Sequence, residues 1–414
     1  MSLLTLNKMY THFNIDKFIS QHVTGRDTSL LTEDFQKNNT KLHAQIDEKS
    51  VLVIGGAGTI GSNYIKALLR FRPKRLYVID INENGLTELV RDLRSSVGYN
   101  IPDDFITYPV NFGDKVFEKI FRRFAPFDIV ANFAAHKHVR SEKDVFSIEA
   151  MINNNVLRAR QLLELLAEFP PRHFFCVSTD KATNPVNIMG ASKKLMEELI
   201  MAYSSVIPIT TARFANVAFS NGSLPLGFIE RINKRQPLSC PLGIKRFFVS
   251  PVESGEICLA ASVLGESGDI FFPELDENKD MLDFSKIAIA LLNSLGLEAD
   301  ICKTEDEARD KALKLGEKIT SYPICFFESD TSGEKSFEEF YTNNEELDLL
   351  TFINLGIIKN SPKRNMAEID NIFKRLESLF CSNTVNKGSV VEILKEYLPN
   401  FEHIEKGKHL DQRM

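Results

Sequence analysis

Three residues suited to acid–base chemistry stand together at Thr179, Asp180 and Lys181, directly after the apolar run HFFCV. An aspartate beside a lysine brings two groups of opposite charge together, and each shifts the pKa of the other. Such a pair can supply both the acid and the base of a proton-transfer reaction. The structural alternative is a helix-capping turn after a strand, because threonine and aspartate are good caps.

A glycine-rich turn is the second chemical feature. Gly55, Gly58 and Gly61 follow the apolar run SVLVI and precede a helical pattern. Glycines at this spacing allow a tight turn and let the backbone approach a pyrophosphate, which then faces the N-terminus of a helix. The strand and helix on either side favour a dinucleotide site that includes Thr59 and Ile60, rather than a connection without a ligand.

The end of the second apolar run indicates which dinucleotide binds. Asp80 closes LYVID, 25 positions after Gly55. A carboxylate there accepts hydrogen bonds from the ribose hydroxyls of adenosine and repels a 2′-phosphate. Neighbouring Asn82 and Asn84 supply no arginine for such a phosphate, so NAD is predicted in preference to NADP.

Further cofactor contacts are expected where the next two runs end. Asn111 and Phe112 follow the third run, and Asn111 suits either a hydrogen bond to adenine or a turn. Ala134 and Ala135 follow the fourth run. Small side chains there leave room for a cofactor, although helix–sheet packing also requires them.

Several segments together resemble one enzyme family. GGAG, AAHKHV, STDKA, NPVNIMGASK and RFANV are similar to the UDP-N-acetylglucosamine 4,6-dehydratases of the capsular polysaccharide type, over residues 20–355. These are extended short-chain dehydrogenases, in which a tyrosine usually stands four residues before the active-site lysine. Here Met189 takes the tyrosine's place before Lys193, as in some members of the family. A thioether transfers no proton, so the base must lie elsewhere.

The resemblance implies a reaction and a role for each residue. Oxidation at C4 of the sugar acidifies the C5 proton, water leaves across C5 and C6, and the hydride returns to C6. Lys181 is implied as the base at C5 and Asp180 as the acid for the C6 hydroxyl, while Thr179, with a contribution from Asp180, assists at the C4 hydroxyl. Lys193 would hold the nicotinamide ribose, unless it is a solvated helix lysine. Met189 shapes the pocket.

The same resemblance implies the substrate contacts. Arg246 in KRFFVS suits a bidentate contact with phosphate, although a surface arginine is the structural alternative. His138 is also a candidate for a packed structural residue. Asn155 matches a position that stabilises the active site, and Glu334 and Lys335 match a segment near the substrate or else begin a helix. The expected substrate-binding residues are Lys137, His138, Asn216, Ser220, Gly222 and Arg246.

Two other functions stay open. A nucleotide-sugar 4-epimerase would keep the fold, but that chemistry normally wants the missing tyrosine. A non-catalytic NAD-binding regulatory protein would explain the missing tyrosine, but not the retained lysine. The nucleotide, UDP or GDP, and the configuration at C5 also stay open. We expect no metal, because no His, Asp and Glu cluster has metal-binding spacing.

The elements that must position these residues form an α/β fold. The runs SVLVIGG, RLYVIDI, FITYPVN, FDIVANFAA, HFFCVST and ITTARFANV alternate with helical patterns. This alternation predicts a Rossmann-like, doubly wound parallel sheet that binds ligands at the carboxyl ends of its strands. We expect a helical extension (1–48), an NAD-binding core (49–220), a smaller mixed substrate-binding lobe partly interleaved with the core (221–345) and a helical extension (346–414).

Composition limits the partners and the compartment. The net charge of −6 argues against a nucleic acid partner. Six scattered cysteines without a C-x-x-C pair indicate reduced thiols. No signal peptide and no apolar run near the ~20 residues of a membrane span are found. We therefore expect a cytoplasmic enzyme, and amphipathic segments near both ends suggest a homo-oligomer.

Overall fold

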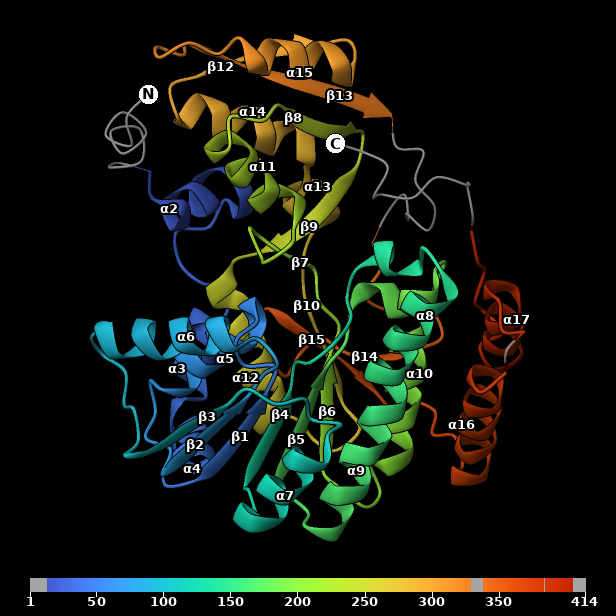
Figure 1. Cartoon of the computed structure of the whole chain (residues 1–414). Coiled ribbons are helices and arrows are strands. Elements are labelled where there is room, and N and C mark those ends of the chain that lie inside the picture. Colours follow the sequence, from blue (N-terminus) through green and yellow to red (C-terminus); the bar gives the residue numbers. More distant parts are fainter. Residues whose placement is uncertain (1–12, 329–337, 383, 405–414) are drawn as a thin grey trace.

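The computed structural model describes residues 13–328, 338–382 and 384–404, and it shows a body built on a large sheet with a smaller lobe above it (Figure 1). Within these residues the sheet has nine strands in the order β14-β15-β10-β6-β5-β4-β1-β2-β3. The strands from β10 to β3 are parallel, whereas β15 and β14 are antiparallel additions at one edge. The predicted doubly wound sheet is thus confirmed. The strands are β1 (Ser50–Ile54), β2 (Arg75–Ile79), β3 (Asp104–Tyr108), β4 (Ile129–Asn132), β5 (His173–Val177), β6 (Ile209–Ala212), β10 (Ile270–Pro273), β14 (Glu346–Asp348) and β15 (Leu355–Lys359).

Helices cover both faces of this sheet (Figure 1). On one face α12 packs closely against α5 and α4, and on the other α10 packs against α9 and α16. The central strands are buried along almost their whole length, which is why they read as continuous apolar runs. The helices of the body are α3 (Thr32–Lys37), α4 (Asn39–Ile46), α5 (Thr59–Leu68), α6 (Glu83–Ser95), α7 (Lys115–Phe124), α8 (Val145–Ile152), α9 (Arg158–Glu168), α10 (Ile188–Tyr203), α12 (Pro251–Leu264), α16 (Met366–Phe380) and α17 (Lys387–Tyr397).

The lobe contains two three-stranded sheets, β11-β9-β7 and β12-β13-β8, with helices packed on them. Its apolar core includes Phe228, Ile232 and Leu291. Since β7 begins just after β6 ends, the lobe lies over the carboxyl edge of the main sheet (Figure 1). Its elements are β7 (Asn216–Val217), α11 (Leu224–Asn233), β8 (Leu238–Leu242), β9 (Lys245–Val249), α13 (Glu277–Asp280), β11 (Met281–Asp283), α14 (Phe284–Ser294), β12 (Glu298–Cys302), α15 (Glu305–Leu313) and β13 (Ser321–Glu328).

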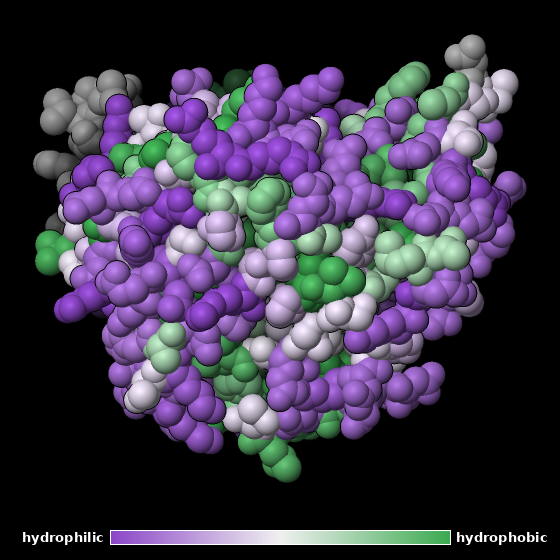
Figure 2. Space-filling model, turned by 90° about the horizontal axis from the view of Figure 1, so that it is seen from below, coloured by the Kyte–Doolittle hydropathy of each residue, from purple (hydrophilic) through white to green (hydrophobic). Residues whose placement is uncertain are grey.

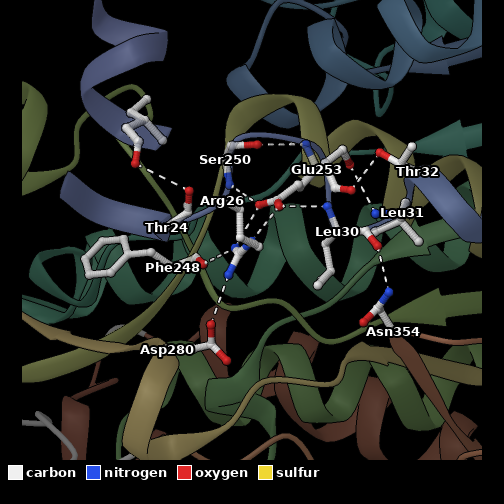
Figure 3. Close-up of polar contacts among 12 residues, drawn as sticks. Thr24, Arg26, Leu30, Leu31, Thr32, Phe248, Ser250, Glu253, Asp280 and Asn354 are labelled. Carbon is white, nitrogen blue, oxygen red and sulfur yellow. Dashed lines mark hydrogen bonds and ion pairs between the residues drawn. The ribbon is translucent and has the colours of Figure 1, made fainter. Parts of the chain in front are cut away.

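The N-terminal segment touches both parts of the molecule. Helix α2 (Ile15–Ile19) gives Phe18 and Ile19 to the core of the lobe, whereas α4 gives Leu42 and Ile46 to the core of the body. Between these helices, Arg26 binds both parts at once (Figure 3). The limits proposed for the domains stay a prediction.

The side of the molecule away from the lobe carries mostly polar residues (Figure 2). Figure 2 shows that side as mainly hydrophilic, with small separate apolar groups. No helix among the described residues is both long enough and apolar enough to cross a membrane. All six cysteines are free thiols.

Candidate active site

The glycine turn joins β1 to α5 at the carboxyl edge of the sheet. Gly55 has φ +76°, and a Cβ there would lie 2.5 Å from the backbone nitrogen of Ala134. A Cβ at Gly61 would lie 2.3 Å from the carbonyl oxygen of Gly55. Gly58 precedes α5, and no side chain caps that helix. The N-terminus of α5 therefore keeps backbone donors for an anion, with Thr59 and Ile60 in its first turn.

The predicted adenosine contacts lie beside this turn. The Asp80 carboxylate accepts hydrogen bonds from the backbone nitrogens of Ala57 and Asn82, each at 2.9 Å. A carboxylate has about four acceptor sites, so Asp80 can still accept from ribose hydroxyls. Asn111 accepts a bond from the nitrogen of Gly113 at 2.8 Å and so forms a turn, while Phe112 is buried.

The segment after β4 approaches the turn from the other side. The nitrogen of Ala134 donates to the Asn132 side chain at 3.0 Å, which holds the Ala134–Ala135 step against Gly55. Lys137 donates to the carbonyl oxygen of Asn221 at 2.9 Å, and the nitrogen of Asn221 donates to the Thr59 hydroxyl at 2.9 Å.

The loop at residues 220–222 thus connects a predicted substrate residue with the predicted cofactor turn. Within this loop Ser220 is buried, and a Cβ at Gly222 would lie 2.9 Å from the His138 ring. The His138 ring therefore lies against this loop while the residue stays exposed, and its role stays a prediction.

Asn155 fixes the backbone of the same segment. Its side-chain oxygen accepts a bond from the nitrogen of His136 at 2.8 Å, and its amide donates to the carbonyl of His136 at 3.0 Å. The amide also donates to the Ser192 hydroxyl on α10 at 3.1 Å. Asn155 lies in a π-helical turn, a feature frequent at functional sites.

The acid–base residues follow β5 in a 3₁₀ turn. The Lys181 ammonium donates to the two oxygens of Asp180 at 3.0 and 3.2 Å, and the Thr179 hydroxyl donates to Asp180 at 2.8 Å. The side chain of Asp180 is 3% exposed and that of Lys181 is 28% exposed. Burial lowers the pKa of Lys181, but the charges of Asp180 and Glu338 outweigh it and the pKa is raised. These two carboxylates therefore favour the protonated form of Lys181.

Met189 and Lys193 lie one helical turn apart on α10. Met189 is buried, and its backbone nitrogen donates to Glu142 at 2.9 Å. Lys193 donates to the carbonyl of Val177, at the end of β5, at 2.6 Å. Burial lowers the pKa of Lys193, because a buried ammonium is poorly solvated.

The C-terminal chain holds the loop before α10. The nitrogens of Glu402 and Ile404 donate to the carbonyls of Pro185 and Val186 at 3.2 and 3.0 Å. Between them, His403 lies 3.6 Å from Glu142, the acceptor of the Met189 nitrogen.

Glu338 is a site residue that sequence reasoning missed. It accepts a bond from the Asn216 amide at 2.6 Å and lies 3.5 Å from the Arg246 guanidinium and 4.0 Å from the Lys181 ammonium. It therefore brings two predicted substrate residues together with the predicted base. The only signal for it in the sequence was the pair of glutamates between two phenylalanines in SFEEF. The predicted residues Glu334 and Lys335 lie outside the described residues.

A buried ion pair behind the site was also missed. Glu197 on α10 and Arg213 after β6 are each 1% exposed and are 3.0 Å apart. The Ser178 hydroxyl donates to Glu197 at 2.6 Å, which ties the strand end before Thr179 to α10.

Comparison with known proteins identifies relatives of this chain. Residues 51–348 match the family model described as polysaccharide biosynthesis protein. An uncharacterized membrane protein of Methanocaldococcus jannaschii is 34% identical over 54% of this chain and 66% of its own length. CapD of Staphylococcus aureus, a capsular polysaccharide biosynthesis protein, is 25% identical over 86% of this chain and 58% of its own. The chain thus spans between half and two thirds of the length of these relatives.

Other relatives carry names of sugar-nucleotide enzymes. The UDP-N-acetylglucosamine 4,6-dehydratase (inverting) of Campylobacter jejuni is 24% identical over 73% of this chain and 84% of its own. A UDP-glucose 4-epimerase of Rickettsia typhi is 30% identical over 54% of this chain and 65% of its own.

Solved structures share the fold. Pen of Bacillus thuringiensis has a TM-score of 0.61 at 20% identity, covering 80% of this chain and 98% of its own. DesIV of Streptomyces venezuelae, a dTDP-glucose 4,6-dehydratase solved with NAD and TYD bound, has a TM-score of 0.53 at 18% identity, covering 70% and 88%.

Proposed function

This chain belongs to the polysaccharide biosynthesis protein family, and we propose that it is an NAD-dependent nucleotide-sugar 4,6-dehydratase acting on UDP-N-acetylglucosamine or a related nucleotide sugar. The observation that carries the proposal is the Asp180–Lys181 pair. Its two groups are joined at 3.0 Å beside the carboxyl edge of the sheet, while Met189 stands where a tyrosine would transfer protons.

The residues of the glycine turn fit NAD. Gly55 and Gly61 leave no room for a side chain, α5 presents uncapped donors, and Asp80 keeps acceptor sites for a ribose. Bound NAD supplies the hydride acceptor for C4 and the hydride donor for C6. Lys193, whose ammonium lies at the end of β5, is the residue we assign to the nicotinamide ribose.

The chain's own groups handle the protons. Transfer of one proton along the hydrogen bond from the Lys181 ammonium to the Asp180 carboxylate gives a neutral amine and a carboxylic acid. Lys181 then removes the C5 proton and Asp180 protonates the departing C6 hydroxyl, with Thr179 bonded to Asp180 and assisting at the C4 hydroxyl. We assign the contacts with the nucleotide sugar to Lys137, His138, Asn216, Ser220, Gly222 and Arg246. We assign this chain to the methionine-bearing members on the position of Met189, which is buried. The free cysteines agree with a cytoplasmic enzyme.

The test is incubation of the purified protein with NAD and UDP-N-acetylglucosamine in D2O, followed by mass spectrometry and proton NMR. We expect loss of water, a 4-keto-6-deoxy sugar and one deuteron at C5. A C4 epimer without loss of water would favour the epimerase, which is the function named for the relative from Rickettsia typhi. Unchanged UDP- and GDP-linked sugars would overturn both enzymatic functions.

Two variants identify the base. Lys181→Gln removes the group assigned to C5, so we expect kcat to fall by roughly 10²- to 10⁴-fold, with NAD binding retained. Met189→Leu is the matched control, because it keeps an apolar side chain of similar volume, and kcat should change by less than about fivefold. A strong loss in Met189→Leu together with an active Lys181→Gln would show that the base is misassigned.

A further inference from the structure

Glu338 is the buried charged group of the site that the proposed reaction does not yet use. Its side chain is 2% exposed, and its two oxygens accept bonds from the Asn216 amide and from the backbone nitrogen of Phe247, at 2.6 and 2.8 Å. A carboxylate in such surroundings is costly unless it is hydrogen-bonded and paired with charge. Glu338 meets both conditions with residues of the proposed site.

The neighbouring segment fixes the position of Glu338. The carbonyl of Phe340 accepts bonds from Arg213 at 2.9 Å and from the Thr183 hydroxyl at 3.3 Å. The Asn184 amide donates to Glu339 at 2.9 Å. Residues 339–340 are thus bound to the chain directly after Lys181, so Glu338 is held relative to that lysine.

The charges around Lys181 form a compact group. Asp180 lies at 3.0 Å and Glu338 at 4.0 Å from the ammonium, and Arg246 lies 3.5 Å from Glu338. Burial and the charge of Asp180 raise the pKa of Glu338 to about 7. In turn, the charges of Asp180 and Glu338 raise the pKa of Lys181, and that of Arg246 opposes them. Protonation of Glu338 and protonation of Lys181 are therefore linked.

We propose that Glu338 is a positioning residue of the dehydration, which acts through Lys181 by holding the ammonium beside Asp180 and through Asn216 by fixing the side chain that we assign to the nucleotide sugar. The inference rests on the proposed function, since Lys181 is a base only in that reaction. In this role Glu338 acts on residues of the site and is not itself assigned to the sugar or the cofactor. It sets the pH at which Lys181 becomes neutral, and hence the pH range of the enzyme.

The test replaces the charge and keeps the shape. Glu338→Gln keeps the length of the side chain but loses the negative charge and one of the two oxygens that accept from Asn216 and Phe247. Lys181 should therefore become neutral at a pH lower by about one unit. The midpoint is measured on the full chain with NAD, from the pH dependence of Lys181 acylation followed by mass spectrometry. With UDP-N-acetylglucosamine as substrate, the limb of the kcat–pH profile that reports Lys181 should move in the same direction.

Two further variants control the experiment. Glu339→Gln removes the adjacent carboxylate, which binds Asn184 and not Lys181, and should leave the midpoint unchanged. Glu338→Asp keeps the charge on a shorter side chain and should give a midpoint between those of the wild type and Glu338→Gln. It also serves as the second reading if Glu338→Gln does not fold.

The outcomes separate this inference from the function beneath it. A wild-type midpoint in folded Glu338→Gln or in Glu338→Asp, or an equal shift in Glu339→Gln, overturns the role of Glu338 even if the wild type is an active dehydratase. If the wild-type protein dehydrates no sugar but Glu338→Gln still shifts the midpoint of Lys181, the Glu338–Lys181 linkage is supported and the dehydratase function is overturned.

Discussion

The three glycines of the nucleotide turn differ in how much space a side chain would have at each position. Gly55 and Gly61 face backbone atoms at 2.5 and 2.3 Å from a built Cβ, whereas the nearest atom at Gly58 is 3.5 Å away, an ordinary contact. The first two glycines are therefore required by the fold itself. Gly58 is open on the side where we expect the pyrophosphate.

Alanine variants should separate stability from cofactor binding. Gly61→Ala should lower the free energy of unfolding by about 2 kcal/mol or more, because backbone must move. Gly58→Ala should keep it within about 1 kcal/mol and weaken NAD binding at least tenfold, because the methyl group occupies the ligand's side. Urea denaturation without NAD and calorimetric titration with NAD measure the two effects. NAD binding of wild-type strength in Gly58→Ala would contradict the placement of the pyrophosphate.

At this scale the sequence predicted residues that act through their neighbours in the chain. Asp180 and Lys181 are adjacent, so their ion pair follows from the sequence itself. Glu338 meets Lys181, Asn216 and Arg246 only after folding, across at least 92 residues, so no local spacing indicates its role.

At the scale of elements, α10 is held in place by the pair Glu197–Arg213. Arg213 also donates to Glu345 at 2.9 and 3.1 Å, so the cation has two carboxylate partners. Burial would raise the pKa of Glu197, but Arg213, Lys194 and the Ser178 hydroxyl lower it to about 2. The helix that carries Met189 and Lys193 is therefore fixed to β6 by charge.

Removal of Glu197 should be costly. Glu197→Ala leaves Arg213 buried with one of its partners gone, and the free energy of unfolding should fall by about 3–5 kcal/mol. Glu118→Ala, which breaks an exposed pair with Arg122, is the control and should cost less than about 1 kcal/mol. Chemical denaturation at pH 7 compares the two. Equal losses would show that burial of the pair is unimportant.

The same pair predicts a pH dependence. The pKa of Glu197 is lower in the folded than in the unfolded protein, so its stabilising effect is present above the ordinary value of 4.5 and is lost as the pH falls through about 2. Glu197→Gln should lack this part of the acid-induced loss. If the wild type and Glu197→Gln lose the same amount of stability between pH 5 and pH 3, the assignment is contradicted.

Elements with long apolar runs were predicted, and short ones were not. β1, β2 and β5 are buried strands flanked by helical patterns, and this alternation identifies them. β14 has three residues and joins the sheet only through β15, which returns antiparallel from a distant part of the chain. Its pairing depends on tertiary contacts that periodicity does not contain.

At the scale of the whole molecule, Arg26 connects the lobe with the body (Figure 3). It donates to Glu253 at the start of α12 at 2.8 and 3.0 Å, to Asp280 in α13 at 3.0 Å and to the carbonyl of Phe248 in β9 at 3.0 Å. Glu253 in turn completes a capping box with Ser250. The Arg26 side chain thus fixes β9, which carries Arg246, relative to α12.

Loss of Arg26 should loosen the lobe. Arg26→Gln leaves the buried Glu253 without its cation, and the free energy of unfolding should fall by about 3 kcal/mol. Hydrogen exchange should become faster in Lys245–Val249 and Glu277–Asp280. Arg309→Gln removes an exposed cation of α15 and is the control. Unchanged exchange in both segments would show that the lobe is held by its apolar contacts alone.

The hydrogen bonds of Glu402 and Ile404 to Pro185 and Val186 have a consequence for biosynthesis. The two carbonyls precede the helix of Met189 and Lys193, and their partners come more than two hundred residues later in the chain. During translation the strands β1 to β6 leave the ribosome long before these partners do. The loop at the proposed catalytic centre can therefore acquire these two hydrogen bonds only after almost all of the described chain has been synthesised.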